Sequence, residues 1–443
     1  MPDQIKPKIL KGFRDFLPEK EEKKRKIQNI LEKIFSRYGF VPIDTPILEY
    51  SEVLLGKGGG ETDKQVYRFS DQGNRDVAMR FDLTVPFARY IAMHRNELYL
   101  PFKRYHIAKV WRGENTQKGR YREFTQCDFD IVGTDSASAD FDILLLMKKS
   151  IEAIGVKNFT IQLSHRGVFN DLLNSLSCGE QSVSILRTVD KLSKIGREQV
   201  ADLLQDICGS EKCGAILSFI QPEKTFQETI AKMRALTGGN SPGIERLSEI
   251  HSYMQETGTE KTFMLNPSIT RGLDYYTGVV FETFLNDAKK IGSVCSGGRY
   301  NNLASLYTSE TIPGVGASIG LDRLLAGLEM TGEEKKSEIF TDIIIFCFDP
   351  KFNGFYHRLC EELRDNGFRC EVFPENKKLG QQFSFAEKKN IPLAVICGED
   401  EMAKQSVSLK DLRTRENYQD LSGSELMKKA AALLSTPSDA ENR

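Results

Sequence analysis

The chain has 443 residues, which is too long for one ordinary hydrophobic core, so we expect two or three domains. Hydrophobic residues make up 40% of the sequence and charged residues 28%, which is ordinary for a globular protein in water. Sixty-one basic and 62 acidic side chains leave a formal net charge of −1. Net charge therefore gives no argument for a nucleic-acid partner, which would have to bind local basic patches.

Nothing in the sequence indicates a membrane-spanning or secreted protein. No segment reaches the roughly 18 uninterrupted apolar residues of a membrane span, and residues 1–8 lack the apolar core of a signal peptide. The nine cysteines form no CxxC pair and lie near no histidine that would complete a zinc cluster. We expect a cytoplasmic protein without a protein-held metal, whose cysteines are mostly small buried residues.

The N-terminal part predicts a helix followed by extended segments. Apolar residues recur at helical spacing across 19–38, and Gly39 follows as a stop signal. Residues 41–50 are typical of extended chain, and 66–71 and 76–82 predict two short strands. The glycine-rich stretch before them is not a P-loop, because the pattern GxxxxGK[ST] is absent.

Residues 104–131 predict an antiparallel hairpin with a long charged loop. Its second strand sends Phe124, Gln126, Asp128 and Asp130 to one face by period-two alternation. The other face is mostly apolar. The loop concentrates groups able to hold a polyanion beside a small zwitterion, with four cations inside eleven residues: Arg112, Lys118, Arg120 and Arg122.

The rest of the chain alternates between helical and strand-rich blocks. Residues 165–258 are helical in pattern, and 271–329 are strand-rich and then helical. Charged residues at 333–337 predict a linker. A smaller α/β domain follows, with strands at 342–348, 369–374, 392–398 and 406–411 and helices at 354–367, 378–389 and 423–434.

The hairpin resembles the second signature motif of class II aminoacyl-tRNA synthetases, and its wording is closest to the histidyl-tRNA synthetase family. The resemblance implies that Arg112 binds the α-phosphate of ATP and the substrate carboxylate, and that Arg120 reaches the γ-phosphate. Glu114 would accept from the adenine amino group and Phe124 would stack on adenine. Arginine suits phosphate because its planar fork binds two oxygens and stays charged.

Two later stretches resemble further motifs of the same family. Residues 271–282, which begin Arg-Gly-Leu-Asp-Tyr-Tyr-Thr-Gly, are the wording most specific to it. There Arg271 matches a catalytic arginine that supplies positive charge at the α-phosphate. Residues 297–303 and 313–324 resemble the third class II motif, a glycine-lined strand running into a helix, in which Arg323 stacks on adenine opposite Phe124.

The resemblance also implies a histidine site and a tRNA contact. Asp82, Thr84 and Gln126 match the residues that bind the ammonium group, beside Arg112, Arg271 and Tyr275. Asp130 and Tyr276 match the pair that recognises the imidazole ring. Many bacterial members carry Glu where this chain has Asp82 and Asp130, and both shortened carboxylates match the eukaryote-like branch. Family members touch the tRNA acceptor end at the loop tip, here Gln117 and Lys118.

We therefore predict a histidine–tRNA ligase that uses ATP with Mg²⁺ on its phosphates. The resemblance implies an α/β protein: a class II catalytic domain over 1–332 on an antiparallel sheet, with a helical insertion at about 165–258, and an anticodon-binding α/β domain over 339–437. The first helix and the proline-containing strand after it resemble the first motif, which builds a homodimer interface. Three alternatives stay open: a separate helical domain, a synthetase for another amino acid, and a regulatory paralogue such as the synthetase-like subunit of ATP phosphoribosyltransferase.

Overall fold

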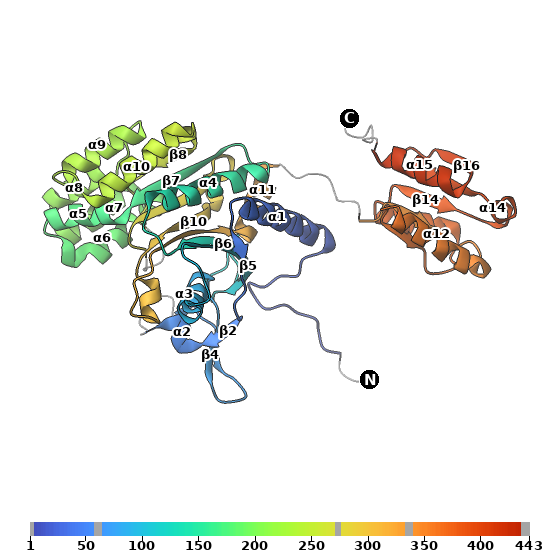
Figure 1. Cartoon of the computed structure of the whole chain (residues 1–443), viewed down its shortest axis with the longest axis horizontal. Helices are drawn as coiled ribbons and strands as arrows, with labels where there is room; N and C mark the ends of the chain where they lie inside the picture. The colour runs from blue at the N-terminus through green and yellow to red at the C-terminus, as the bar shows by residue number, and fades with distance from the viewer. Residues whose placement is uncertain (1–3, 57–63, 271–275, 333–339, 436–443) are drawn as a thin grey trace. The chain divides into compact units, whose positions relative to one another are not determined.

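The computed structural model describes residues 4–56, 64–270, 276–332 and 340–435, and the chain divides into two compact units (Figure 1). The first unit is Met1–Glu334 and the second is Lys335–Arg443. Each unit has its own hydrophobic core. The linker predicted at 333–337, and Arg271 and Tyr275, lie outside the described residues.

An eight-stranded sheet frames the first unit, in the order β1-β5-β6-β11-β10-β9-β7-β8. The outer pairs β1–β5 and β7–β8 are parallel, and the pairs between them are antiparallel. This order brings the glycine-lined third-motif strand beside the hairpin. The strands are β1 Val41–Pro42, β5 Phe102–Trp111, β6 Glu123–Val132, β7 Phe159–His165, β8 Phe263–Leu265, β9 Val279–Leu285, β10 Ser293–Tyr300 and β11 Gly314–Gly320.

The predicted hairpin is confirmed. Strands β5 and β6 pair from Phe102 opposite Val132 to Trp111 opposite Glu123. Period-two alternation sends Cys127, Phe129 and Ile131 into the main core, as predicted. The same alternation leaves the polar side chains of β6 on the opposite face of the sheet.

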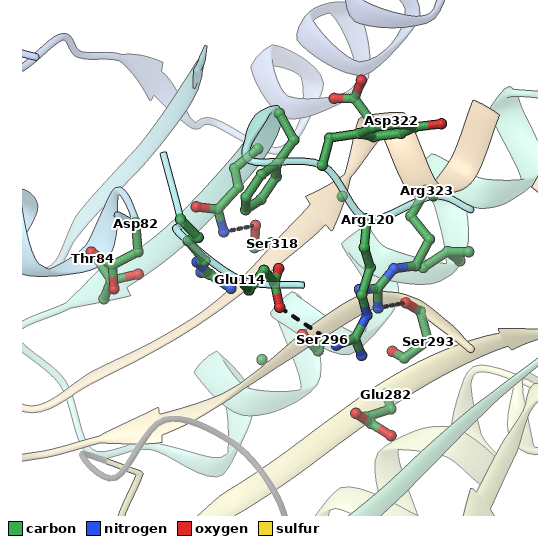
Figure 2. Close-up of a pocket in the computed structure, with 18 of the residues that line it drawn as sticks. Asp82, Thr84, Glu114, Arg120, Glu282, Ser293, Ser296, Ser318, Asp322 and Arg323 are labelled. Atoms are coloured by element: carbon green, nitrogen blue, oxygen red, sulfur yellow. Dashed lines mark hydrogen bonds and ion pairs between the residues drawn. The ribbon is translucent and has the colours of Figure 1, made fainter. Parts of the chain in front are cut away.

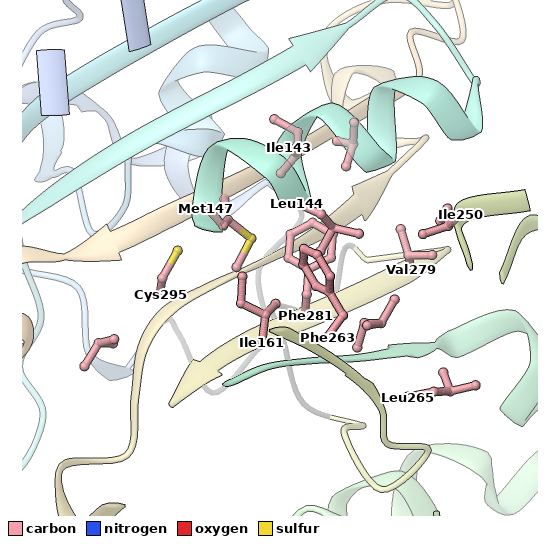
Figure 3. Close-up of a cluster of buried hydrophobic side chains, with 14 of the residues drawn as sticks. Ile143, Leu144, Met147, Ile161, Ile250, Phe263, Leu265, Val279, Phe281 and Cys295 are labelled. Carbon is pink, nitrogen blue, oxygen red and sulfur yellow. The ribbon is translucent and has the colours of Figure 1, made fainter. Parts of the chain in front are cut away.

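Helices cover the apolar face of this sheet. Helices α1 (Pro18–Arg37) and α4 (Ala137–Ala153) both pack on β6. Figure 3 shows Ile143, Leu144 and Met147 of α4 directed at β7 and β9, where they meet Ile161 and Phe281. Each such buried side chain contributes about 1.5–3 kcal/mol. The sheet is thus fixed from one side, and its polar face is left for a site.

A small sheet and two helices lie next to the polar face. The strands β2 (Leu48–Tyr50), β4 (Asp76–Met79) and β3 (Arg68–Ser70) pair antiparallel in that order. The strands predicted at 66–71 and 76–82 are confirmed, although both are shorter. The two helices are α2 Ser51–Leu55 and α3 Thr84–Met93. Helix α11 (Leu321–Thr331), which follows β11, instead buries its leucines in the main core.

Six helices lie between β7 and β8, two strands that pair with each other. The segment therefore leaves and re-enters the same sheet. Helix α7 is kinked at Gly196, whose φ of 83° suits glycine. The helices are α5 Arg166–Ser175, α6 Ser182–Val189, α7 Leu192–Cys208, α8 Ser210–Phe219, α9 Phe226–Leu236 and α10 Pro242–Glu256.

The second unit has a five-stranded sheet in the order β13-β12-β14-β15-β16. The first three strands are parallel and the last two antiparallel. The predicted strands and helices are present, and α14 and β16 are additional. The elements are β12 Ile343–Ile345, α12 Asn353–Asp365, β13 Cys370–Val372, α13 Leu379–Lys388, β14 Leu393–Ile396, α14 Glu399–Lys404, β15 Val407–Asp411, β16 Asn417–Leu421 and α15 Gly423–Ser435.

Eight of the nine cysteines are buried and all nine are free thiols, as their scattered spacing indicated. Across the described ranges, no helix has the length and apolar character needed to cross a bilayer. Short 3₁₀ turns complete the fold at Gly179–Gln181, Glu260–Thr262, Asn286–Ile291, Leu303–Leu306 and Pro350–Phe352.

Candidate active site

A polar pocket opens on the uncovered face of the large sheet, with a cavity of about 310 Å³ (Figure 2). Its walls come from the hairpin loop, from strands β6, β9, β10 and β11, and from the start of α11. Nine of the predicted site residues line it: Asp82, Thr84, Arg112, Glu114, Arg120, Phe124, Gln126, Tyr276 and Arg323.

Five predicted site residues do not line the described cavity. Arg271 and Tyr275 lie outside the described residues. Gln117 and Lys118 are at the tip of the hairpin loop, where Gln117 and Arg120 exchange backbone hydrogen bonds of 3.2 and 2.8 Å. Asp130 is buried beneath the polar face.

The hairpin loop is folded back onto α11 by Gly119. This residue has a φ of 74°, and a Cβ there would meet Ile291 at 2.9 Å and Arg323 at 3.4 Å. Glycine is needed on both counts. The close approach brings Arg120 towards Glu114, with 3.6 Å between their charged atoms.

Arginines gather at the end of the pocket that is formed by the hairpin loop and the start of α11. Arg112 donates from Nε to the carbonyl of Phe81 at 2.9 Å, and its guanidinium lies 5.2 Å from the centre of the Phe124 ring. Arg323 donates to the carbonyl of Ser293 at 2.8 Å. Burial, with Arg120 and Arg112 nearby, lowers the pKa of Arg323 to about 10, although Glu114 opposes this. The guanidinium stays charged at neutral pH, and the excess of positive charge favours an anion.

Two buried oxygens without partners mark the other end. Asp82 accepts from the backbone N–H of Val85 through Oδ1 at 3.1 Å. Its Oδ2 and the Oε1 of Gln126 are buried and have no hydrogen-bond partner among the described residues. Burial is the main reason that the pKa of Asp82 rises to about 6, against the opposing effects of the Val85 N–H and Arg112. Unpaired buried acceptors are costly, so both oxygens suit a cationic ligand.

Asp130 is already engaged by two side chains that no sequence pattern pointed to. Tyr300 donates its hydroxyl to Oδ1 at 2.6 Å, and Arg104 pairs with Oδ2 at 2.7 Å. Arg104 is fully buried, with its guanidinium 4.1 Å from the centre of the Phe87 ring. Burial raises the pKa of Asp130, and Arg104 and Tyr300 oppose that rise.

The N-terminal segment packs against two residues of the pocket wall, which the sequence did not predict. Arg14 pairs with Asp322, and its guanidinium lies 3.2 Å from the centre of the Tyr121 ring. Asp322 also accepts from the backbone N–H of Thr125 at 2.7 Å. Both Tyr121 and Asp322 line the pocket. No local pattern indicates these contacts, because they join residues far apart in the sequence, and Arg14 and Asp322 are 308 positions apart.

Comparisons with known proteins agree along most of the chain. A sequence profile described as histidyl-tRNA synthetase matches residues 12–324, and one described as anticodon binding domain matches residues 342–433. The chain is 51% identical to the histidine–tRNA ligase of Treponema denticola over 94% of this chain and 96% of that protein. It is 45% identical to that of Rhodopirellula baltica over 93% and 95%.

A solved structure agrees with the sequence relatives. The histidyl-tRNA synthetase from Nostoc sp. PCC 7120 superposes with a TM-score of 0.86 at 31% identity, covering 97% of this chain and 100% of that one. The fold and the matched profiles define an aminoacyl-tRNA synthetase with an anticodon-binding domain. The chain belongs to the histidyl-tRNA synthetase family.

Proposed function

We propose that the polar pocket of the first unit activates histidine with ATP. The chain is a histidine–tRNA ligase by its family, an ATP-dependent enzyme that joins histidine to its tRNA. The observation that carries the assignment to this pocket is its division of charge. Three arginines gather at one end, and two unpartnered acceptors, on Asp82 and Gln126, lie at the other.

ATP would occupy the arginine end. Phe124 and Arg323 would hold the adenine between them, and Glu114 would accept from its amino group. Arg112 would bind the α-phosphate and Arg120 the γ-phosphate. The clustering of the three guanidiniums supports this assignment, because a triphosphate would neutralise their positive charge.

Histidine would occupy the carboxylate end. Its ammonium group would donate to Asp82, Thr84 and Gln126, which supplies partners for the two unsatisfied oxygens. Asp130 and Tyr276 would recognise the imidazole ring. Each oxygen of Asp130 already has one partner, so an imidazole N–H would use a remaining lone pair. Tyr275 would complete this subsite.

The chemistry requires no protein nucleophile. A carboxylate oxygen of histidine attacks the α-phosphorus, a P–O bond to the bridging oxygen breaks, and pyrophosphate leaves. Arg112 and Arg271 would stabilise the charge on the five-coordinate phosphorus, an effect typically worth ~10²–10³ in rate for one donor. A ribose hydroxyl at the 3′ end of the tRNA then attacks the carbonyl carbon, and AMP leaves with the former carboxylate oxygen.

Mg²⁺ would be held mainly by the phosphates. The described residues contain no group of three His, Cys, Asp or Glu side chains placed to hold a metal. Mg²⁺ commonly takes one or two carboxylates plus phosphate oxygens and water. Glu282, which lines the pocket, could supply one such carboxylate. The ion would neutralise charge on the leaving pyrophosphate.

The tRNA would contact both units. Gln117 and Lys118 would meet its acceptor end, since they lie at the tip of the loop that forms the pocket wall. The second unit, with its anticodon-binding match, would bind at the anticodon. Which bases are read would depend on base contacts, whereas lysines would mainly position the phosphates.

We further infer that the chain acts as a homodimer through the region of α1 and β1. Exposed large apolar side chains near this region, among them Ile47, Leu48 and Tyr50, support an interface. Sedimentation of the intact chain at micromolar concentration would report a mass near twice 50.1 kDa. A monomer that is fully active would contradict this inference.

Histidine-dependent ATP–pyrophosphate exchange tests the proposed reaction, with the other nineteen amino acids as controls. Exchange with histidine alone is expected, and it would exclude a synthetase for another amino acid. A folded protein that binds histidine but supports no exchange would instead favour the regulatory-paralogue alternative.

A further inference from the structure

The hydrogen bonds of Gln126 decide which end of its amide faces the pocket. Its Nε2 donates to the Ser318 hydroxyl oxygen at 2.8 Å, the dashed line that ends on Ser318 in Figure 2. Its Oε1 is left without a partner in the described part of the chain. A serine hydroxyl can accept from one group while it donates its single hydrogen to another. The direction of that second bond therefore fixes the amide.

The acceptor of the second bond is Asp128. Strands β6 and β11 place Asp128 directly opposite Ser318, on the polar face between Gln126 and Asp130. From this position the Ser318 side chain acts on the Asp128 carboxyl as a hydrogen-bond donor and lowers its pKa. Asp128 is 1% exposed, and its Oδ1 has no hydrogen-bond partner in the described ranges. Asp128 does not line the pocket, so its influence must pass through Ser318.

An ionised carboxylate only accepts hydrogen bonds. With Asp128 ionised, the hydroxyl of Ser318 must point at Asp128, and its lone pairs then accept from the Gln126 amide. All hydrogen bonds in this series therefore run in one direction, from Gln126 to Ser318 to Asp128. Reversal would turn the amide NH₂ towards the pocket, where it would repel an ammonium group.

We propose that Asp128 is a positioning residue, which acts through Ser318 to hold the Gln126 amide with Oε1 facing the ammonium group of the substrate. This role deepens the proposed function and rests on the assignment of Gln126 to the histidine subsite. It gives a task to a buried carboxyl group that contacts neither substrate. It also makes histidine recognition depend on the ionisation of a residue behind the pocket wall.

The surroundings of Asp128 make its ionisation responsive to pH. Burial is the main cause that raises its pKa to about 7, with Asp130 and Asp82 adding to the rise, while Arg104 and Ser318 oppose it. Other titratable or charged groups close to it are His106 opposite it on β5, Arg80, Cys127 and Cys295. Above pH 7 the carboxylate accepts from Ser318. Below pH 7 the protonated carboxyl group can donate, and the direction of the hydrogen bonds through Ser318 is no longer fixed.

The test uses the intact chain in ATP–pyrophosphate exchange at saturating ATP. Asp128→Asn supplies an NH₂ donor and Ser318→Ala removes the connection, so each should raise KM for histidine about 10- to 100-fold. KM for ATP should change less than threefold in both. Ser318→Thr keeps a hydroxyl and should restore most of the affinity. Ser150→Ala removes a buried hydroxyl of α4 far from the pocket chemistry and serves as the matched control.

A pH profile and a double variant separate positioning from a general structural defect. In the wild type, KM for histidine should rise below pH 7 more steeply than in Asp128→Asn, since titration of the substrate itself is common to both. In a Gln126→Ala background, Asp128→Asn should cause no further rise in KM for histidine, because both residues act through the same series of hydrogen bonds.

The outcomes distinguish this proposal from the proposed function. Wild-type exchange with histidine, together with unchanged KM in Asp128→Asn and Ser318→Ala, would overturn the positioning role alone. Additive losses in the double variant would overturn it as well. If Asp128→Asn fails to fold, Ser318→Ala still decides. Absence of exchange in the wild type would instead count against the proposed function.

Discussion

The two ends of the pocket differ in the sign of the charge that they hold. Burial lowers the pKa of Arg323 to about 10 at one end and raises the pKa of Asp82 to about 6 at the other. In both cases the empty protein disfavours the charged form, and a ligand of opposite charge would restore it. The pocket is thus suited to two substrates at once, a polyanion and a cation, and it orients them relative to each other.

Arg112 belongs to the arginine end and also affects the pKa of Asp82 at the other end, so its loss should have the largest effect. Arg112→Ala should reduce histidine-dependent exchange by about 10²–10³-fold, since it removes a donor to the charge that develops at the α-phosphate. Initial exchange rates at saturating substrates measure this. Arg95→Ala, a surface arginine paired with Glu310, is the matched control and should retain normal rates. Near-normal activity of Arg112→Ala would contradict the role proposed for Arg112 at the α-phosphate.

Removal of residues 339–443 tests the division of function between the two units. Because each unit has its own core, the shortened chain should keep adenylate formation while tRNA charging falls at least about tenfold further. Exchange and charging assays on the same preparation give the ratio, and circular dichroism checks that the chain is folded. Equal losses in both assays would contradict the division.

The raised pKa of Asp82 predicts a pH dependence at the carboxylate end alone. Asp82 is ionised only above about pH 6, so it loses its attraction for an ammonium group as pH falls through that value. KM for histidine should rise several-fold between pH 7 and 5.5, while KM for ATP stays nearly flat. Asp82→Asn serves as the reference, because it retains the titration of the substrate. Parallel curves for the two proteins would refute the assignment.

Mutations on the two faces of β6 should change different properties, namely stability on the apolar face and KM for histidine on the polar face. Phe129→Ala on the apolar face should lower the free energy of unfolding by about 3–5 kcal/mol, because Phe129 is fully buried against Phe35. Gln126→Ala on the polar face should cost far less stability and should act mainly on KM for histidine. Urea unfolding monitored by fluorescence, beside exchange kinetics, measures both quantities.

The hairpin and the pocket loop could be predicted because their signals are local. Alternation along β6 predicts both of its faces, and Gly119 stands where the loop must turn. The pattern of the C-terminal strands and helices predicted that unit as well, apart from α14 and β16. Nine predicted site residues converge on one cavity, although their individual roles stay predictions.

What the sequence could not provide are pairings between distant residues. Arg14 with Asp322, Tyr300 with Asp130 and Gln126 with Ser318 join segments more than 150 positions apart. The strand order β6-β11-β10 creates the last two of these pairs, and no periodicity along the chain encodes that order. Strand β8 was missed for a related reason, since it has only three residues and is recognisable only beside its partner β7.

Separate titration of the intact protein with ATP and with histidine tests the division of the pocket most directly. Calorimetry on Asp82→Asn should show histidine binding weakened at least about tenfold and ATP binding within threefold of the wild type. Arg323→Ala should show the reverse pattern. If each variant weakened both ligands to the same extent, the pocket would not have two ends of opposite charge, and the assignment of one substrate to each end would be wrong.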